Sequence, residues 1–339
     1  MSEPVASAEL LEDRGEAAVA DDFFRSRPFL DAEGVTHTLR ITSEGGELVA
    51  PLIVREIGDG PERDAISPYG YPGLTPVSGQ HLDPLQRPDP VRASDIDHTG
   101  AGSMSDAPLE PADIDFSGIG LVTIFLRHTL AEPPLAGASE RNVVQIADPA
   151  LPAKSRGSDR NQINKNLRRG YEVRLVPGPD ATEAERAGFL TAYEQTMRRT
   201  AAAERYFFAA EYFDRILGST QAWLALAHAP SGDIAAASIA VRSDGHLHYY
   251  LSGSSDSYLR DSPMKNVVAA LVGLSAELGL PLNLGGGMVR GDRLEEFKRG
   301  FANREQSWHS SEIVCDEASY ARLGDGCAAC AFFPAYRAS

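Results

Sequence analysis

Leu284–Phe301, which reads LGGGMVRGDRLEEFKRGF, is the stretch that decides how this chain folds. Three consecutive glycines follow the apolar run 280–284, a pattern typical of a buried strand whose end bends sharply or lies close to another segment. A short helix is predicted over 294–301, where Phe297 and Phe301 are four residues apart and share one face. The stretch therefore predicts a strand, a glycine-rich bend and a half-buried helix.

Lys298 lies beside that apolar stripe, so its ammonium group can be held near a half-buried cleft. A cation held in such a place is suited to stabilising a developing oxyanion. The same pattern also describes an ordinary strand, turn and helix with a surface lysine, and local chemistry alone favours that simpler interpretation.

Length and charge narrow the class of protein. The chain has 339 residues, enough for two ordinary domains, and its hydrophobic content of 42% is that of a globular protein. Its net charge of −16 excludes a general binder of nucleic acids or membrane surfaces.

The charges are unevenly distributed along the chain. Residues 1–22 hold seven acidic residues and one arginine, and we predict that they form a disordered acidic tail. Residues 154–174 hold seven basic residues against Asp159 and Glu172. A local basic strip on an acidic body indicates a specific anionic partner, and it fits a solvated helix face equally well.

Membrane, secretion and metal signals are weak in this sequence. No apolar run approaches the roughly eighteen residues of a spanning helix, and the N-terminus does not resemble a secretory signal. Cys327 and Cys330 form a C-x-x-C pair with Cys315 upstream, but zinc needs four ligands and His309 is the only histidine nearby. We therefore expect a reduced, cytoplasmic protein without a metal.

Strands dominate the predicted first half. Residues 67–73, SPYGYPG, exclude regular structure, and Tyr69 and Tyr71 indicate either an ordered loop facing a pocket or a packed turn. Residues 75–110 show no periodicity and are predicted to form a long loop, either a lid or disordered. Strands are predicted at 36–41, 47–53, 118–126 and 142–146.

The second half alternates helices with strands, which is typical of an α/β layer design. Its clearest signal is the capping box Thr182-x-x-Glu185, which begins an amphipathic helix. Helices are predicted at 158–170, 182–197, 209–217 and 263–278. Strands are predicted at 171–176, 223–228, 234–242, 247–251, 282–285 and 308–315.

Four stretches of the second half, with this order of elements, resemble the GNAT acyltransferase fold and, more closely, the Fem family of aminoacyl-tRNA-dependent transferases. The pairing of LGGG with F-K-x-x-F is the specific part of this resemblance, which is good over 155–305 and loose over 25–150. The four stretches are the basic helix and strand of 160–173, YEQTMRRTAAAERYFFAAEY at 193–212, HYYLSGS at 248–254, and the signature of 284–301, to which SPYGYPG at 67–73 adds a weaker match.

The resemblance implies an α/β fold of two tandem GNAT-like domains, each a mixed, mostly antiparallel sheet flanked by helices. It places the first domain at 23–152 and the second at 153–315, and residues 316–339 can return to the first. In the Fem family the amine acceptor lies in a cleft between the domains, and the aminoacyl end of the tRNA enters beside the second.

The resemblance also implies roles for single residues. Lys298 would stabilise the oxyanion formed as an amine attacks the ester carbonyl, and the backbone carbonyl of Phe297 would position that amine. An aminoacyl ester is already activated, so the enzyme needs mainly proximity and charge stabilisation, and no general base is evident. Without the resemblance, packing is the first interpretation of the residues that would line the acceptor site: Tyr249, Tyr250, Ser252, Arg198, Arg199, Tyr206, Tyr69 and Tyr71. The residues implied to contact tRNA are Arg160, Lys165, Arg168 and Arg169.

Acyl-CoA is the alternative donor. A conventional GNAT enzyme binds the CoA pyrophosphate with a glycine-rich turn that opens a helix. Here the corresponding turn, SGSSDSYLRDSP at 252–263, has one glycine and two aspartates, which favours aminoacyl-tRNA held through phosphate contacts by the basic strip. A non-catalytic binding module is a third possibility, and it predicts that Lys298→Met leaves function intact.

The expected function is the transfer of an aminoacyl group, with alanyl and glycyl as candidates, from aminoacyl-tRNA to the free amine of a peptide. The acceptor belongs either to peptide antibiotic biosynthesis or to peptidoglycan precursor modification. The chain lacks the heptad stretch of a coiled-coil arm, which favours the first. We expect a monomer that is not inserted in a membrane and uses no cofactor beyond the tRNA co-substrate.

Overall fold

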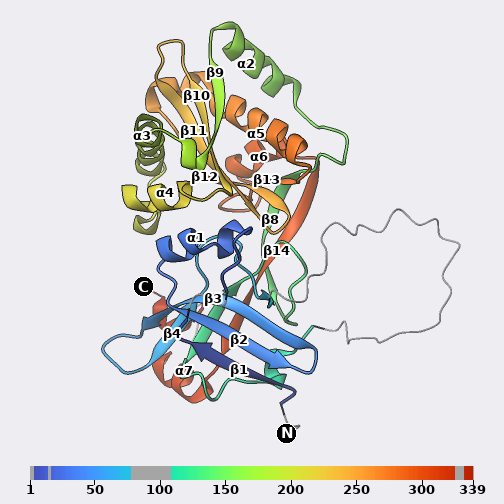
Figure 1. The fold of residues 1–339 in the computed structure, drawn as a ribbon, viewed down its shortest axis with the longest axis vertical. Coiled ribbons are helices and arrows are strands. Elements are labelled where there is room, and N and C mark those ends of the chain that lie inside the picture. The colour runs from blue at the N-terminus through green and yellow to red at the C-terminus, as the bar shows by residue number, and fades with distance from the viewer. Residues whose placement is uncertain (1–3, 14–16, 78–107, 325–331, 339) are drawn as a thin grey trace, which may run out of the picture.

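The computed structural model of the chain describes residues 4–13, 17–77, 108–324 and 332–338. Within these residues fourteen strands form one continuous, mostly antiparallel sheet flanked by helices (Figure 1). The expected α/β class is therefore confirmed. The strand order is β6-β1-β2-β3-β4-β7-β14-β8-β13-β12-β11-β10-β9, with β5 paired to β3.

The first half of the chain forms one end of this sheet. Its strands are β1 (Ala6–Leu11), β2 (His37–Ser43), β3 (Gly46–Glu56), β4 (Arg63–Ile66), β5 (Thr75–Pro76), β6 (Ile114–Asp115) and β7 (Thr123–Arg127). The strand expected at 118–126 begins only at Thr123, because Gly120 takes a positive φ of 65° that breaks the extended chain. Most of the expected loop at 75–110 lies outside the described residues.

The expectation of a disordered tail over 1–22 is wrong for residues 6–11. Strand β1 pairs antiparallel with β2 and parallel with β6. Ala6 is buried, and Ala8 and Leu10 pack against the core of the first half. This alternation of apolar residues has period two, but the small alanines and the acidic neighbours hide it in the sequence.

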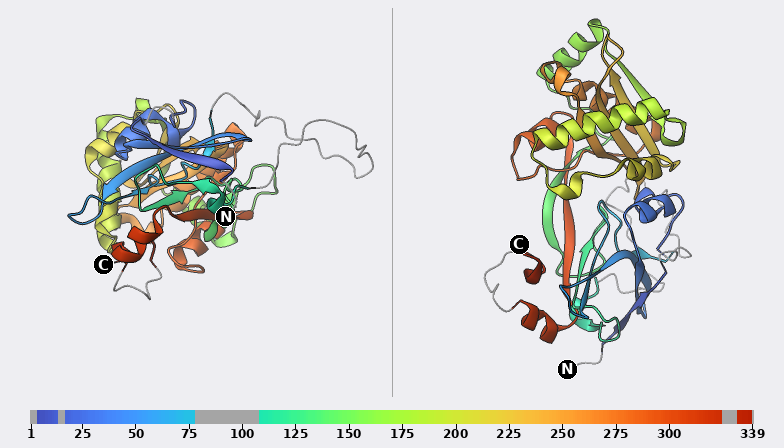
Figure 2. Two further views of the ribbon diagram at one scale, coloured as in Figure 1. Left: turned by 90° about the horizontal axis from the view of Figure 1, so that it is seen from below. Right: turned by 90° about the vertical axis from the view of Figure 1, so that its left-hand side faces the viewer.

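Two long strands connect the halves. Strand β14 (Arg304–Val314) pairs with β8 (Ser139–Ala147) along one edge and with β7 along the other. Strand β8 in turn pairs with β13 (Leu282–Asn283) of the second half. Figure 2 shows both long strands running between the two ends of the molecule.

The second half carries most of the helices. Helices α3 (Glu183–Arg199) and α4 (Ala210–Leu217) cover one face of its sheet, and α5 (Met264–Leu278) covers the other (Figure 1). The capping box of α3 is confirmed, since Thr182 Oγ1 accepts from the Glu185 amide and the Glu185 carboxylate accepts from the Thr182 amide. The remaining elements are α2 (Gly157–Arg168), β9 (Glu172–Pro177), β10 (Ala222–His228), β11 (Ile234–Ser243), β12 (His246–Ser254) and α6 (Arg293–Arg299).

The expected boundary at residue 152 does not separate two cores. Phe23, Phe24 and the short helix α1 (Arg27–Ala32) belong to the first half, yet they pack into the apolar core beneath α3 and α4. The end of the chain returns to the first half: Tyr336 Oη lies 2.7 Å from Thr123 Oγ1, and Arg337 donates to Asp64. Helix α7 (Glu317–Leu323) precedes this segment.

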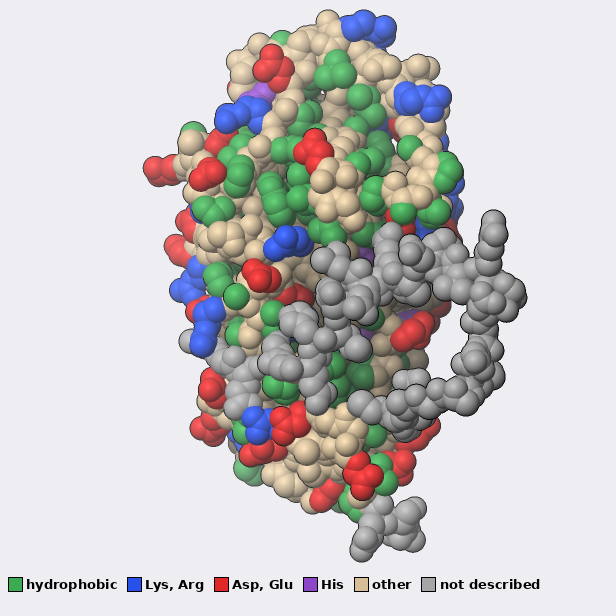
Figure 3. Space-filling view, turned by 45° about the vertical axis from the view of Figure 1, so that its right-hand side comes forward, with side chains coloured by type: hydrophobic (Ala, Val, Ile, Leu, Met, Phe, Trp, Pro, Cys, Tyr) green, Lys and Arg blue, Asp and Glu red, His purple; other side chains and the backbone are tan. Residues whose placement is uncertain are grey.

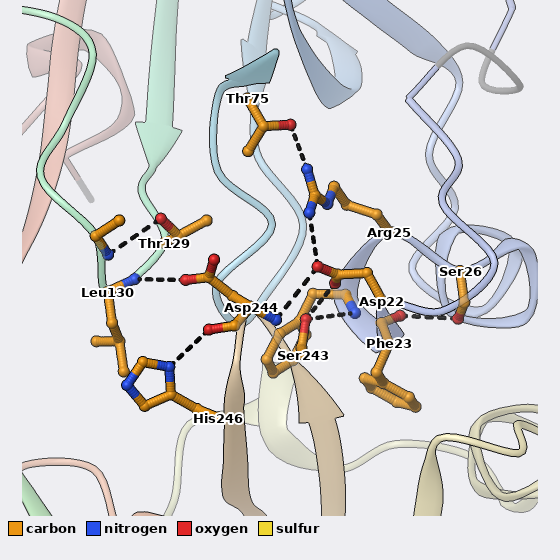
Figure 4. Close-up of polar contacts among 12 residues, drawn as sticks. Asp22, Phe23, Arg25, Ser26, Thr75, Thr129, Leu130, Ser243, Asp244 and His246 are labelled. Carbon is orange, nitrogen blue, oxygen red and sulfur yellow. Dashed lines mark hydrogen bonds and ion pairs between the residues drawn. The ribbon is translucent and has the colours of Figure 1, made fainter. Parts of the chain in front are cut away.

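A polar junction also joins the halves at the β11–β12 turn (Figure 4). The carboxylate of Asp22, which is ion-paired with Arg25 at 2.7 Å, accepts from the Ser243 hydroxyl and from the Asp244 amide. Asp244 accepts in turn from the Leu130 amide at 3.2 Å. Burial, and then the Asp22 charge, raise the pKa of Asp244 to about 6.

Asp244→Asn is expected to stabilise the protein at neutral pH and to change little at pH 4. The folded state raises the pKa of this carboxyl from 3.8 to about 6, so it holds the proton that the unfolded chain releases in that window. The wild-type free energy of unfolding therefore falls as pH rises from about 4 to about 6, by about 1–3 kcal/mol. Urea unfolding of both proteins at pH 4 and pH 7 measures this difference. A variant whose free energy of unfolding falls with pH as steeply as that of the wild type would contradict the prediction. Asparagine tolerates the positive φ of 49° and keeps the acceptor for Leu130.

Candidate active site

The glycine-rich bend after β13 runs along β8. The Gln145 amide donates to the Gly285 carbonyl at 3.1 Å, and Gly285 takes a φ of 75°, so the expected strand ends at Asn283. A Cβ on Gly286 would stand 2.5 Å from the Asn142 side chain. Asn142 Nδ2 donates to the Gly287 carbonyl at 3.0 Å, so the bend is pinned to β8.

Helix α6 is held by carboxylates at its start. Asp292 is the N-cap residue, and its side chain accepts from the amides of Glu295, Met288 and Val289. The buried Glu295 accepts from the Gly291 amide at 2.7 Å. The helix is thus tied to the bend that precedes it.

Lys298 is buried, with 8% of its surface exposed. Its Nζ donates to the Gly286 carbonyl at 2.7 Å. A Cβ on Gly285 would stand 3.0 Å from the Lys298 Nζ. Burial lowers the pKa of Lys298 to about 8, against the opposing effect of the Asp292 charge. An ammonium group has three donors, so two remain for an oxyanion.

Phe297 is half-buried and packs edge-to-face on Phe301, with ring centroids 5.6 Å apart. Its backbone carbonyl accepts from the Gly300 amide at 3.1 Å and keeps a second lone pair for a substrate amine. The aromatic pair expected from the sequence therefore belongs to the apolar core beneath α5.

The structure separates the two tyrosines of β12. Tyr249, like Phe297, packs against the core beneath α5, whereas Tyr250 packs against the core beneath α3 and α4. A β-bulge lies here, because Ile239 pairs with Leu251 while Ala240 pairs with Tyr249. Burial raises the pKa of both tyrosines, so both stay neutral phenols. Ser252 is half-buried on the same strand, three residues beyond Tyr249.

Tyr250 joins an aromatic group between the halves. Its ring lies 5.8 Å from that of Tyr69, which lies 6.0 Å from that of Tyr206. Tyr71 stands beside them and packs on Trp308 at 5.7 Å. Trp308 pairs with Asn142 across β14 and β8, so this group and the lysine bend lie on neighbouring strands. The irregular segment at 67–73 is therefore a packed, ordered loop.

Arg198 and Arg199 are not brought to this aromatic group. Arg198 is exposed and pairs with Glu194 one turn earlier, at 2.6 Å. Arg199 pairs with Asp256 and donates to the Ser254 carbonyl, so it holds the end of α3 to the turn after β12. The expectation that these two arginines line the acceptor site therefore does not fit their positions.

Three residues of this region were not found from the sequence. Glu33 accepts from the Tyr69 amide at 2.8 Å and from the Tyr212 hydroxyl at 2.7 Å, and burial raises its pKa. Arg127 lies over the Tyr69 ring, and Arg205 lies over the Tyr206 ring. No local spacing marks them, because their neighbours come from distant parts of the chain.

Residues 153–299 match the family described as acetyltransferase (GNAT) domain. This part of the chain is a GNAT domain. The match includes the glycine-rich bend and ends one residue after Lys298. It makes the protein an acyltransferase, as the resemblance implied.

The fold of the whole chain is similar to that of FemX. The solved FemX structure superposes with a TM-score of 0.57 at 10% identity, covering 91% of this chain and 96% of FemX. A tandem GNAT protein from the clavulanic acid biosynthesis pathway has a TM-score of 0.40 at 10% identity, covering 91% and 99%. The structure of L-PGS from Bacillus licheniformis has a TM-score of 0.41 at 16% identity, covering 57% of this chain and 62% of L-PGS. No curated protein matches the sequence.

Most of the basic strip of the sequence lies along α2 and its C-cap residue, Arg169. Arg160, Lys165, Arg168 and Arg169 are all exposed, and Arg169 pairs with Asp261. The start of α2 lies against α6, because Arg156 donates to the Glu296 carbonyl at 2.9 Å. Lys and Arg side chains project at the upper end of the molecule in Figure 3, the end at which α2 lies in Figure 1.

The turn before α5 of the GNAT domain is occupied by protein groups. The Asp261 carbonyl accepts from the side chains of Gln162 and Asn166 of α2. The amides of Lys265 and Asn266 donate to the carbonyls of Ser262 and Pro263. Few amides therefore remain there for a pyrophosphate.

Metal, thiol and membrane features of the described chain are few. Within it, no three histidine, cysteine or acidic side chains gather as a metal site. Cys315 is a free, half-buried thiol, and Cys327 and Cys330 lie outside the described residues. None of the helices described is long and apolar enough to cross a bilayer. A cavity of about 490 Å³ beside α3 and β11 lies away from Lys298.

Proposed function

We propose that this GNAT protein transfers an aminoacyl group from aminoacyl-tRNA to the free amine of a peptide. The observation that carries the proposal is Lys298, a buried ammonium group fixed by the Gly286 carbonyl at the end of a glycine-rich bend. The pairing of that bend with Phe297 and Phe301 is the part of the sequence that most resembles the Fem family.

The reaction needs a cation more than it needs a strong base. The neutral amine attacks the ester carbonyl, and the carbonyl oxygen becomes an anion that two Lys298 N–H groups can bind. The new C–N bond forms as the ester C–O bond breaks, the ribose hydroxyl of the tRNA leaves, and the amine loses one proton. Phe297 offers its carbonyl to the attacking amine. No further cofactor is needed in this scheme.

The position of α2 supports tRNA as the donor. Its exposed basic residues begin beside α6, the helix that carries Lys298, so an acceptor arm bound along α2 brings its end toward the lysine. The aspartate-bearing, occupied turn at 252–263 weighs against a CoA pyrophosphate.

Neutralising α2 is expected to weaken the tRNA reaction specifically. Lys165→Gln with Arg168→Gln removes two phosphate contacts, so kcat/KM for charged tRNA falls about tenfold or more and its salt dependence flattens by about two in slope. Arg215→Gln on α4, an exposed arginine on the opposite face, is the matched control and keeps the wild-type kinetics. Unchanged salt dependence in the double variant would contradict the proposed contact.

The donor is tested by comparing charged tRNA with acyl-CoA on a small panel of free amines. Product from aminoacyl-tRNA, with none from acyl-CoA, is the expected result, and the reverse would overturn the proposal. Alanyl and glycyl are the transferred groups that we propose to test first. The acceptors proposed are peptides of antibiotic biosynthesis or peptidoglycan precursors in the cytoplasm, with the protein acting as a monomer.

A further inference from the structure

Arg127, at the end of β7, is a largely buried cation among aromatic rings between the two halves. Its guanidinium carbon lies 5.6 Å from the centroid of the Tyr69 ring, 5.5 Å from that of Phe125 and 5.9 Å from that of Trp308. Its backbone is fixed on both sides, because its amide donates to Ser67 Oγ and its carbonyl accepts from the Gly73 amide. The side chain therefore stands in a rigid frame.

The guanidinium group of Arg127 lacks an acceptor among the described residues. Its Nε is buried without a hydrogen-bond partner, and no carboxylate of the described chain lies within ion-pair distance. The charge of Glu33 acts on Arg127 and opposes the lowering of its pKa by burial, but the Glu33 oxygens accept from the Tyr69 amide and the Tyr212 hydroxyl. A buried cation without an acceptor is costly in a folded protein, and an anion supplied by a ligand would remove that cost.

Arg141 provides the contrast within the same sheet. Its guanidinium carbon also lies 5.5 Å from the centroid of the Phe125 ring. Unlike Arg127, it is paired with Glu312 and donates to Ser310 Oγ at 2.6 Å. Of the two arginines that lie over the Phe125 ring, one is therefore satisfied by the protein and the other is not.

We propose that Arg127 binds a carboxylate group of the amine acceptor, which makes the acceptor an amino acid or a peptide with a free carboxylate. A guanidinium fork matches a planar carboxylate through two parallel hydrogen bonds. The rings of Tyr69 and Trp308 supply apolar walls, and the nearby Glu33 disfavours a doubly charged phosphate. The identity of this anion as part of the acceptor rests on the proposed function; the anion site itself does not.

Binding without turnover tests the site. Calorimetry compares alanyl-alanine and N-acetylalanine with their uncharged C-terminal amides, and propyl phosphate is the phosphate probe. Wild-type protein is expected to bind at least one of the carboxylates tenfold or more tightly than its amide. Arg127→Gln loses this preference, Arg127→Lys retains part of it, and Arg141→Gln keeps it. Thermal unfolding establishes that each variant is folded.

Three results would overturn the inference: no preference for either carboxylate over its amide, a preference that survives in Arg127→Gln, or tighter binding of propyl phosphate than of the carboxylates. Failure of aminoacyl transfer from tRNA, with Arg127-dependent carboxylate binding retained, would overturn the proposed function and leave the anion site standing.

Discussion

Lys298→Met is expected to lower kcat by about a hundredfold to a thousandfold without loss of stability. The kinetic effect follows from removing the only ammonium group at the glycine-rich bend, within the described residues, that can stabilise an oxyanion. An ordinary surface lysine would show no such effect, and neither would a binding module.

Most substitutions of buried residues lower the free energy of unfolding, but Lys298→Met is expected to raise it or leave it unchanged. Burial lowers the pKa of Lys298 from 10.5 to about 8, so the folded state releases a proton that the unfolded chain keeps between those values. Stability of the wild type therefore rises with pH across that window, and at pH 7 the charged lysine costs up to about 3 kcal/mol. Methionine fills similar space without that cost.

Lys265→Met is the matched control. Lys265 pairs with the buried Asp159 at 2.9 Å, so its loss leaves a carboxylate without its cation and lowers the free energy of unfolding by about 1–3 kcal/mol. Its kcat stays near the wild-type value. Urea unfolding at pH 7 and steady-state transfer assays on the three proteins separate the two lysines. Equal kcat values for Lys298→Met and the wild type would contradict the catalytic role of Lys298.

Gly253→Ala is expected to destabilise the protein by about 2–3 kcal/mol, the largest stability effect of a single methyl group that we predict. A Cβ on Gly253 would fall deep inside the contact radius of the Ala192 carbonyl and of the Tyr193 backbone on α3. Neither atom is the end of a flexible side chain, so the helix itself must move away from β12. Glycine in the S-G-S segment is therefore a packing requirement.

Gly273→Ala in α5 is the control for this change. Nothing lies within 4 Å of a Cβ at Gly273, and the residue is exposed within the helix. Alanine there is expected to raise the free energy of unfolding by up to about 1 kcal/mol. Urea denaturation of both variants tests the pair, and an unchanged midpoint for Gly253→Ala would show that α3 adapts freely.

Local patterns in the sequence were sufficient for most elements of the second half. The capping box at Thr182 and Glu185 and the four-residue spacing of Phe297 and Phe301 each depend on contacts between residues that are close in sequence. Such contacts can be predicted from the sequence alone. The same holds for the strand before the glycine-rich bend, although Gly285 shortens it. These patterns did not decide the position of Lys298, because local chemistry alone favoured a surface lysine and the structure buries it.

Contacts between distant segments were not predictable in this way. Strand β1 depends on β2 and β6 for its partners, and α1 finishes a core most of whose members, from Val176 to Leu251, lie more than 140 residues away. Arg127 and Glu33 acquire their surroundings from Tyr69, Trp308 and Tyr212 only when the halves meet. The bulge that lets the adjacent residues Tyr250 and Leu251 face the same core is likewise a property of strand pairing.

The pH dependence of single-turnover transfer from preformed aminoacyl-tRNA tests the central role of Lys298 most directly. An enzyme-free control corrects for hydrolysis of the ester. If the lysine acts as a cation, the rate rises as the acceptor amine loses its proton and then falls above a pH of about 8, where Lys298 becomes neutral. A rate that keeps rising through pH 10 would mean that the charged form of Lys298 is not the catalyst.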